Sequence, residues 1–196
     1  MQDIAAEVEA VMLPHLGIRA VELVGSRADG SATRLSDWDF VVLTDRFDEV
    51  ARALPELVTE LDPLGQQWDR ISAYPCYMLL LRGPAKVDLI FPDEPYESLP
   101  PWTVTGGTLD GIDQHFWDWI LWLASKLEKG EDELVRRELV KMSDHLLRPL
   151  GIDRVPGSIA AALAGYRAAR DRREHEFGVA VSRRREREVL PAVSSG

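Results

Sequence analysis

Two apolar runs joined by a polar connection constrain this chain more than any other feature. The first run, residues 21–24, ends at Gly25-Ser26, and the second run covers residues 40–43. Short apolar runs bounded by glycine and polar residues are typical of β-strands. A Gly-Ser pair at the end of a strand lets the backbone approach a ligand closely, and its N–H groups and hydroxyl suit an anion such as a phosphate.

Two carboxylates lead into the second run. Because side chains alternate between the faces of an extended chain, Asp37 and Asp39 are expected to share one face, while Trp38, Phe40 and Val42 face the core. Two carboxylates on one small patch repel each other in a low-dielectric site unless a proton or a cation lies between them. The spacing therefore predicts either a solvated strand edge or a divalent metal site.

A third carboxylate lies in a predicted hairpin, residues 77–91, where two apolar runs flank a Gly-Pro connection. Asp88 falls between two apolar residues of the second strand, which is unusual unless that face of the strand is polar. Taken alone, it is interpreted as a solvent-facing residue of an edge strand. Helical periodicity predicts covering helices over residues 3–13 and 47–61, the latter ending near Gly65.

The second half of the chain has a different pattern. Residues 92–109 hold four prolines and two glycines, which is typical of a linker. Helical stripes then cover residues 112–127 and 132–146, and a third helix begins near Ser158. The expected organisation is a sheet domain, a linker and a helical domain, over residues 1–98, 99–107 and 108–196.

Aromatic, histidine and arginine residues of the second half are interpreted as structural. Four of the six tryptophans lie between positions 102 and 122, which is typical of a core or a domain seam. His115 and His145 have no partner at a metal-binding spacing. The arginines within residues 167–173 and 183–185 interleave with acids, which predicts a solvated helix face rather than a nucleic-acid surface.

Length and charge narrow the class of protein. The 196 residues suffice for one large domain or two small ones. The net charge of −10 arises in the first hundred residues, with 18 Asp or Glu against 8 Lys or Arg, whereas the rest holds 15 of each. An acidic field disfavours DNA or RNA and attracts cations, although ordinary solubility charge explains the same excess.

Location and redox state follow from two further observations. No run approaches the roughly eighteen apolar residues that a membrane span requires, and the N-terminal stretch is acidic where a signal peptide is basic. We therefore expect a cytoplasmic protein without membrane contact. The single Cys76 lies in an apolar run and is expected to be a buried, inert thiol.

The stretches GSRADGSA and SDWDFVV together resemble the nucleotidyltransferase superfamily, whose pattern is a Gly-Ser pair, a nearby arginine and glycine, and S-D-x-D before apolar residues. The one departure is Trp38, where the family usually has an aliphatic residue on the core face. The resemblance implies an α+β fold, with a small mixed sheet and helices packed on one face. The branch that it resembles is the antibiotic nucleotidyltransferases, which transfer a nucleotide from ATP to a hydroxyl of a small molecule.

The same resemblance implies a role for each site residue. Asp37 and Asp39 would hold Mg²⁺, expected as two ions, and Asp88 would either complete the metal site or accept the proton of the attacking hydroxyl. The nucleotide-binding residues would be Gly25, Ser26, Arg27 and Lys126. The nucleotide is expected in a cleft between the two domains.

The expected reaction is Mg²⁺-dependent transfer of AMP from ATP to an aminoglycoside-type antibiotic, with release of pyrophosphate, which would confer antibiotic resistance. The acidic charge favours a cationic acceptor, with Asp93, Glu94 and Glu97 expected at its rim. A neutral acceptor, such as a lincosamide or a sugar, is supported almost equally. The alternative class is an antitoxin or regulatory protein of the same fold that binds a partner protein through an exposed aromatic surface. The charge disfavours a nucleic-acid terminal transferase, and the oligomeric state is left open between monomer and homodimer.

Overall fold

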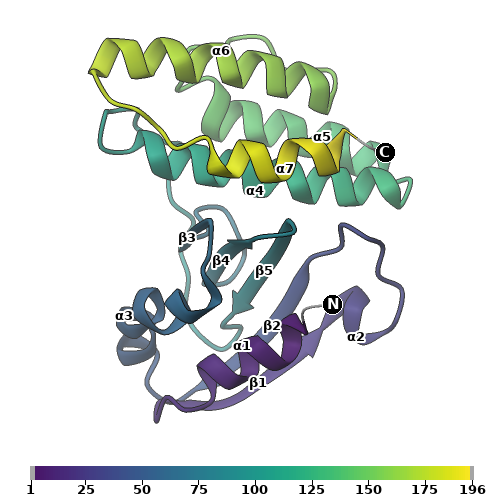
Figure 1. Cartoon of the computed structure of the whole chain (residues 1–196), viewed down its shortest axis with the longest axis vertical. Coiled ribbons are helices and arrows are strands. Elements are labelled where there is room, and N and C mark those ends of the chain that lie inside the picture. Colours follow the sequence, from purple (N-terminus) through teal and green to yellow (C-terminus); the bar gives the residue numbers. More distant parts are fainter. Residues whose placement is uncertain (1–2, 195–196) are drawn as a thin grey trace. The chain divides into compact units, whose positions relative to one another are not determined.

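The computed structural model describes residues 3–194, and the chain divides into two compact units, Met1–Leu99 and Pro100–Gly196. All the strands of the described residues belong to the first unit, and the second is helical (Figure 1). The expected α+β class, with a small mixed sheet and a C-terminal helical region, is confirmed. The interpretation of residues 99–107 as a linker stays a prediction.

The first unit is a five-stranded sheet with covering helices. In chain order its elements are α1 Ile4–Met12, β1 Ile18–Val24, α2 Gly25–Ala28, β2 Trp38–Thr44, α3 Phe47–Leu57, a 3₁₀ turn Val58–Leu61, β3 Gly65–Trp68, β4 Cys76–Leu81 and β5 Ala85–Ile90. The strand order is β1-β2-β5-β4-β3. β2 and β5 run parallel, and every other neighbouring pair is antiparallel.

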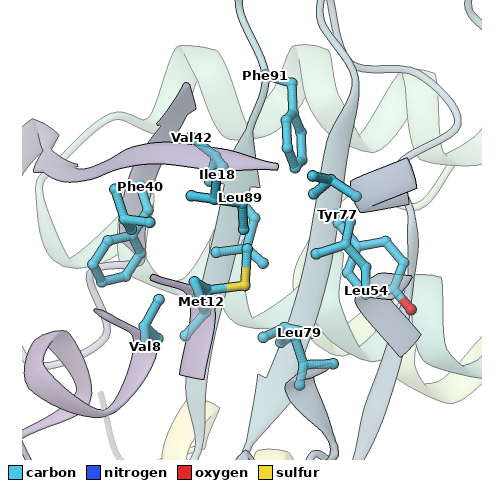
Figure 2. Packing of buried hydrophobic residues seen from close by; sticks show 14 of the residues in the cluster. Val8, Met12, Ile18, Phe40, Val42, Leu54, Tyr77, Leu79, Leu89 and Phe91 are labelled. Atoms are coloured by element: carbon cyan, nitrogen blue, oxygen red, sulfur yellow. The ribbon is translucent and has the colours of Figure 1, made fainter. Parts of the chain in front are cut away.

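One face of this sheet packs against α1 and α3 to form the core. Alternate residues of the strands supply it, including Phe40 of β2, Leu79 of β4 and Leu89 of β5, all fully buried. Figure 2 shows these side chains meeting Met12 of α1 and Leu54 of α3. Because strand side chains alternate, the residues next to these inward positions lie on the opposite face of the sheet. That second face carries the candidate site.

The strand β3 was not predicted from the sequence, which placed only a helix end near Gly65. Its four residues, GQQW, contain no apolar run, and its pairing with β4 defines it as a strand. Tyr77 of β4 donates a hydrogen bond to the Gln66 side chain (3.0 Å), so polar contacts with a neighbour stabilise this edge. The structure also confirms that Cys76 is buried.

The second unit is built around one long helix. Its elements are α4 Leu109–Glu128, α5 Asp132–Met142, a π-helical turn Ser143–Leu147, α6 Ile159–Phe177 and α7 Arg184–Val193. α4 contacts α5, α6 and α7, which pack around it (Figure 1). The Ser158 hydroxyl caps α6 by accepting a hydrogen bond from the Ala161 N–H (3.2 Å). Trp117 and Trp119 of α4 are buried, as the aromatic crowding predicts for a core.

The prediction of a solvated arginine face is wrong for two arginines. Arg170 of α6 and Arg185 of α7 are only 2% and 6% exposed. Arg170 donates to Glu186 (2.7 Å), and Arg185 donates to Asp113 of α4 (3.1 Å). These arginines lie in the interior because their acidic partners come from other parts of the chain, which a local charge pattern does not reveal.

Asp113 is the centre of this buried network. Its carboxylate is fully buried and accepts hydrogen bonds from the Tyr166 hydroxyl (2.7 Å) and the Trp117 indole N–H (3.1 Å), in addition to the bond from Arg185. The network therefore links α4, α6 and α7 through one side chain.

Among residues 3–194 no helix has the length and apolar character needed to cross a bilayer.

Candidate active site

Three carboxylates converge on the face of the sheet opposite the core. Asp37 directly precedes β2, Asp39 lies in β2, and Asp88 lies in β5. One oxygen from each can be chosen so that all three lie within 4.8 Å of one another. The parallel register of β2 and β5 pairs Asp39 with Asp88, so the sheet itself brings the distant third acid to the other two.

This donor set suits a hard divalent cation. Mg²⁺ and Ca²⁺ prefer oxygen ligands, and Mg²⁺ is commonly held in proteins by one or two carboxylates together with substrate phosphates. The side chains of Asp37 and Asp88 are largely buried, with exposures of 7% for the Asp37 residue and 13% for the Asp88 side chain. A solvated strand edge, the other interpretation of the Asp37 and Asp39 spacing, does not match this burial.

Gly25 lies directly against the cluster. Its φ of +69° is a backbone conformation that favours glycine, and a Cβ at this position would lie 2.7 Å from Asp39 Oδ2. The register of β1 and β2 explains the contact, because Val24 pairs with Asp39 and the next residue turns across it. Both the turn and the close approach of the carboxylate therefore require glycine here.

Replacing Gly25 by alanine is expected to lower stability and to displace the Asp39 carboxylate. The backbone conformation alone costs about 1–2 kcal/mol for a residue with a Cβ. Gly30→Ala is a matched control, because Gly30 has a φ of +79° but no atom within 4 Å of the added Cβ. Urea denaturation should show a larger loss for Gly25→Ala, and calorimetry should show weaker Mn²⁺ binding for that variant alone. Equal losses in both assays would contradict the proximity of Gly25 to the site.

Arg27, in the short helix α2, holds the segment that carries the carboxylates. Its Nε donates to the backbone carbonyls of Ser36 (3.0 Å) and Asp37 (3.1 Å), and its guanidinium lies 4.1 Å from the Trp38 ring centroid. Burial lowers the pKa of Arg27, and the charges of Asp37 and Asp39 oppose that effect. These contacts position Asp37, and a contact of Arg27 with a triphosphate stays a prediction.

Lys86 is a residue of the cluster for which no role was predicted. It lies two positions before Asp88 on the same face of β5, and its ammonium group donates a short hydrogen bond to Asp88 Oδ1. Burial raises the pKa of Asp88, Lys86 acts against this shift, and the charges of Asp37 and Asp69 add to it. The alternation of side chains along β5 could have revealed Lys86 from the sequence, because it places Lys86 on the same face as Asp88.

Asp69 is a second residue that sequence reasoning missed. It directly follows β3, where its backbone N–H donates to the Cys76 carbonyl (2.8 Å), and its charge acts on Asp88. No local pattern marks it, because its proximity depends on the unpredicted pairing of β3 with β4.

Two candidate nucleotide-binding residues remain, one in each unit. Ser26 lies in α2, directly after Gly25, and is partly exposed. Lys126 lies in α4 of the second unit, with its ammonium group 5.1 Å from the Trp122 ring centroid. Their roles in binding a nucleotide stay predictions. His115 accepts a hydrogen bond from the Trp102 indole (3.1 Å) and stacks on Trp119, which agrees with a structural role.

The fold and the three carboxylates define the class of this protein when they are compared with known families. Residues 10–97 match the family model of the nucleotidyltransferase domain. They span most of the first unit and include all three carboxylates, so this unit matches the nucleotidyltransferase domain, the class of domain in enzymes that transfer a nucleotide.

A crystal structure of an aminoglycoside 6-adenyltransferase from Bacillus subtilis is similar with a TM-score of 0.34 and 12% sequence identity, covering 98% of this chain and 96% of that chain. No curated protein matches the sequence.

Proposed function

We propose that this chain is a Mg²⁺-dependent nucleotidyltransferase that transfers AMP from ATP to a hydroxyl of a small molecule and releases pyrophosphate. The observation that carries the proposal is the convergence of three carboxylate oxygens within 4.8 Å, inside the segment that matches the nucleotidyltransferase domain. Oxygen ligands at this spacing suit the Mg²⁺ that accompanies a nucleoside triphosphate.

In this proposal Asp37 and Asp39 would hold Mg²⁺, which would supply positive charge to offset that of the triphosphate. The acceptor oxygen forms a bond to the α-phosphorus, and the bond from the α-phosphorus to the oxygen that bridges to the β-phosphate breaks. Pyrophosphate leaves with that electron pair. Asp88 either completes the metal site or accepts the hydroxyl proton, and its position beside Asp39 suits both roles.

The turn after β1 would bind the phosphates. Gly25 leaves room for the Asp39 carboxylate, and the neighbouring Ser26 offers a hydroxyl and a backbone N–H to an anion. Arg27 keeps Asp37 in place through the carbonyls of Ser36 and Asp37. The chain thus contributes orientation and charge, which are the main contributions of a protein to phosphoryl and nucleotidyl transfer.

The acceptor that the charge distribution favours is cationic, and we propose an aminoglycoside-type molecule. The first hundred residues carry a net charge of −10, which would concentrate a polycationic substrate near the sheet unit. The expected position of Glu94 at the rim of the site is wrong. Glu94 lines a hollow of about 700 Å³ together with Asp45 and Asp48, beyond the C-terminal end of β2, whereas Asp39 lies near the start of that strand. Glu94 therefore does not rim the carboxylate cluster.

A pyrophosphate-release assay tests this function. With ATP and Mg²⁺ we expect turnover of an aminoglycoside, and kcat/KM should fall as salt screens the attraction. A lincosamide and a neutral sugar are the control acceptors.

Calorimetry should show that EDTA abolishes ATP binding, and equal ATP affinity with and without EDTA would contradict the metal site. Turnover that is confined to neutral acceptors, or is indifferent to salt, would contradict the cationic acceptor while retaining nucleotidyl transfer.

The alternative, a binding protein of the same fold, required an exposed aromatic surface. Trp117 and Trp119 are buried within the described chain, and Trp102 and Trp122 are half-buried. Two of the four tryptophans thus belong to the interior of the helical unit, and the other two are partly covered. We therefore retain the enzymatic proposal.

A further inference from the structure

Lys86 is a buried cation inside an acidic site. It is the single lysine among the first hundred residues of the sequence, and its side chain is only 7% exposed. A buried ammonium group loses the stabilisation of water, so it is tolerated where a negative charge lies close by. Its hydrogen-bonded partner is Asp88, a member of the carboxylate cluster. Lys86 is therefore part of the candidate site rather than of the surface.

The carboxylate cluster needs positive charge even before a metal binds. Three carboxylates with oxygens within 4.8 Å repel one another, and the charge of Asp69 adds to the field at Asp88. Lys86 supplies one positive charge at this point. It offsets part of the repulsion in the metal-free protein.

The position of Lys86 also makes it a competitor of the metal for a carboxylate. The oxygen of Asp88 that accepts the hydrogen bond from Lys86 is Oδ1, so this ammonium group and a divalent cation would draw on the same carboxylate. The strand register extends this proximity to β2. Val87 pairs with Trp38, the first residue of β2, so Lys86 and Asp37 each directly precede one member of this pair.

We propose that Lys86 is a built-in counter-cation of the carboxylate cluster, which stabilises the metal-free protein and competes with the divalent cation for Asp88. This inference rests on the proposed function, because it assumes that the cluster binds a metal. It adds that the nucleotide-free enzyme binds this metal more weakly than its three carboxylates alone would allow. The positive charge of Lys86 then favours release of the metal after turnover.

Mn²⁺ binding to the nucleotide-free protein tests the competition. In mildly alkaline buffer, Lys86→Met is expected to bind Mn²⁺ about tenfold more tightly than the wild type. A positive charge that is hydrogen-bonded to a metal ligand repels the bound cation, and this repulsion lowers the affinity for the cation by at least about one order of magnitude. Without metal its melting temperature should be lower than that of the wild type. Mn²⁺ should then raise its melting temperature by more than it raises that of the wild type. Isothermal titration calorimetry and differential scanning calorimetry measure the two effects.

Two control variants separate charge from packing. Lys86→Arg keeps the positive charge and should retain the affinity of the wild type for Mn²⁺. Arg82→Met removes a cation from the same hairpin, where it forms an exposed ion pair with Asp62 (2.9 Å), and should not change Mn²⁺ binding. Lys86→Gln repeats the test with a polar side chain in case Lys86→Met does not fold.

The outcomes distinguish this inference from the function on which it rests. Equal Mn²⁺ affinity in the wild type, Lys86→Met and Lys86→Gln would overturn the competition and leave the metal site intact. Unfolding of both variants that Mn²⁺ does not reverse would also overturn it, because Lys86 would then be structural. Failure of the proposed function looks different, since neither the wild type nor any variant would then bind Mn²⁺.

Discussion

Replacing Asp39 by asparagine is expected to lower kcat/KM by about a thousandfold or more, which corresponds to roughly 4 kcal/mol of transition-state stabilisation. Asparagine keeps the size of the side chain but removes the charge that would hold the metal. The fold should persist, because Asp39 lies on the sheet face opposite the core formed by residues such as Phe40. Asp37→Asn is expected to act in the same way. Pyrophosphate release and thermal melting measure the two effects.

Asp45→Asn is the matched control for these variants. Asp45 follows the far end of β2 and forms an exposed ion pair with Arg19 (3.2 Å), so its loss should leave activity unchanged. Activity retained by Asp39→Asn would remove the metal site from the mechanism. If this variant unfolded instead, Asp39 would have a role in the fold that the present strand assignment does not give it.

Asp113→Asn is expected to lower the free energy of unfolding of the helical unit by about 3–5 kcal/mol. The substitution removes the negative charge that faces Arg185 and Arg170 in the interior, and Arg170 is only 2% exposed. Removing one acid from a buried charge network is strongly destabilising, even though Asp110 still pairs with Arg185 and Glu186 with Arg170. Tryptophan fluorescence during urea denaturation is a suitable measurement, because four of the six tryptophans lie between positions 102 and 122.

The control for this variant is Glu133→Gln. Glu133 pairs with Arg136 on the exposed face of α5 (2.8 Å), and its substitution should leave the transition unchanged. A similarly small effect for Asp113→Asn would show that the acids already paired with these arginines, Glu186 with Arg170 and Asp110 with Arg185, balance their charge without Asp113. The buried network would then be distributed over several acids rather than centred on Asp113.

Much of the sheet and of the site could be predicted from the sequence because the relevant patterns are local. The apolar runs at residues 21–24 and 40–43 lie within β1 and β2, and the predicted hairpin corresponds to β4 and β5. The same alternation places Asp39 opposite the core, as predicted. Local periodicity is sufficient here because a strand with one buried face repeats every two residues.

What the sequence did not reveal depends on contacts between distant segments. The polar strand β3 is defined by its pairing with β4, and its position brings Asp69 near Asp88. Arg185 is buried because Asp113, 72 residues earlier, accepts its hydrogen bond. Lys86 shares the face of Asp88 by strand alternation, but its role became visible only with the hydrogen bond that joins them. Side-chain partners of this kind are determined by the tertiary structure, so no characteristic spacing of residues in the sequence indicates them.

The pairing of Asp39 with Asp88 has a consequence for how this chain can change in length. The connection between β2 and β5 runs through α3, β3 and β4, and insertions in its surface turns leave the two strands in register. A single residue added within β5 before Asp88 changes the parity of the strand, so that the carboxylate turns toward the core and an apolar neighbour takes its place. The number of residues between the acids along the sequence can therefore change. The odd or even position of each acid within its strand cannot change without moving the carboxylate to the other face.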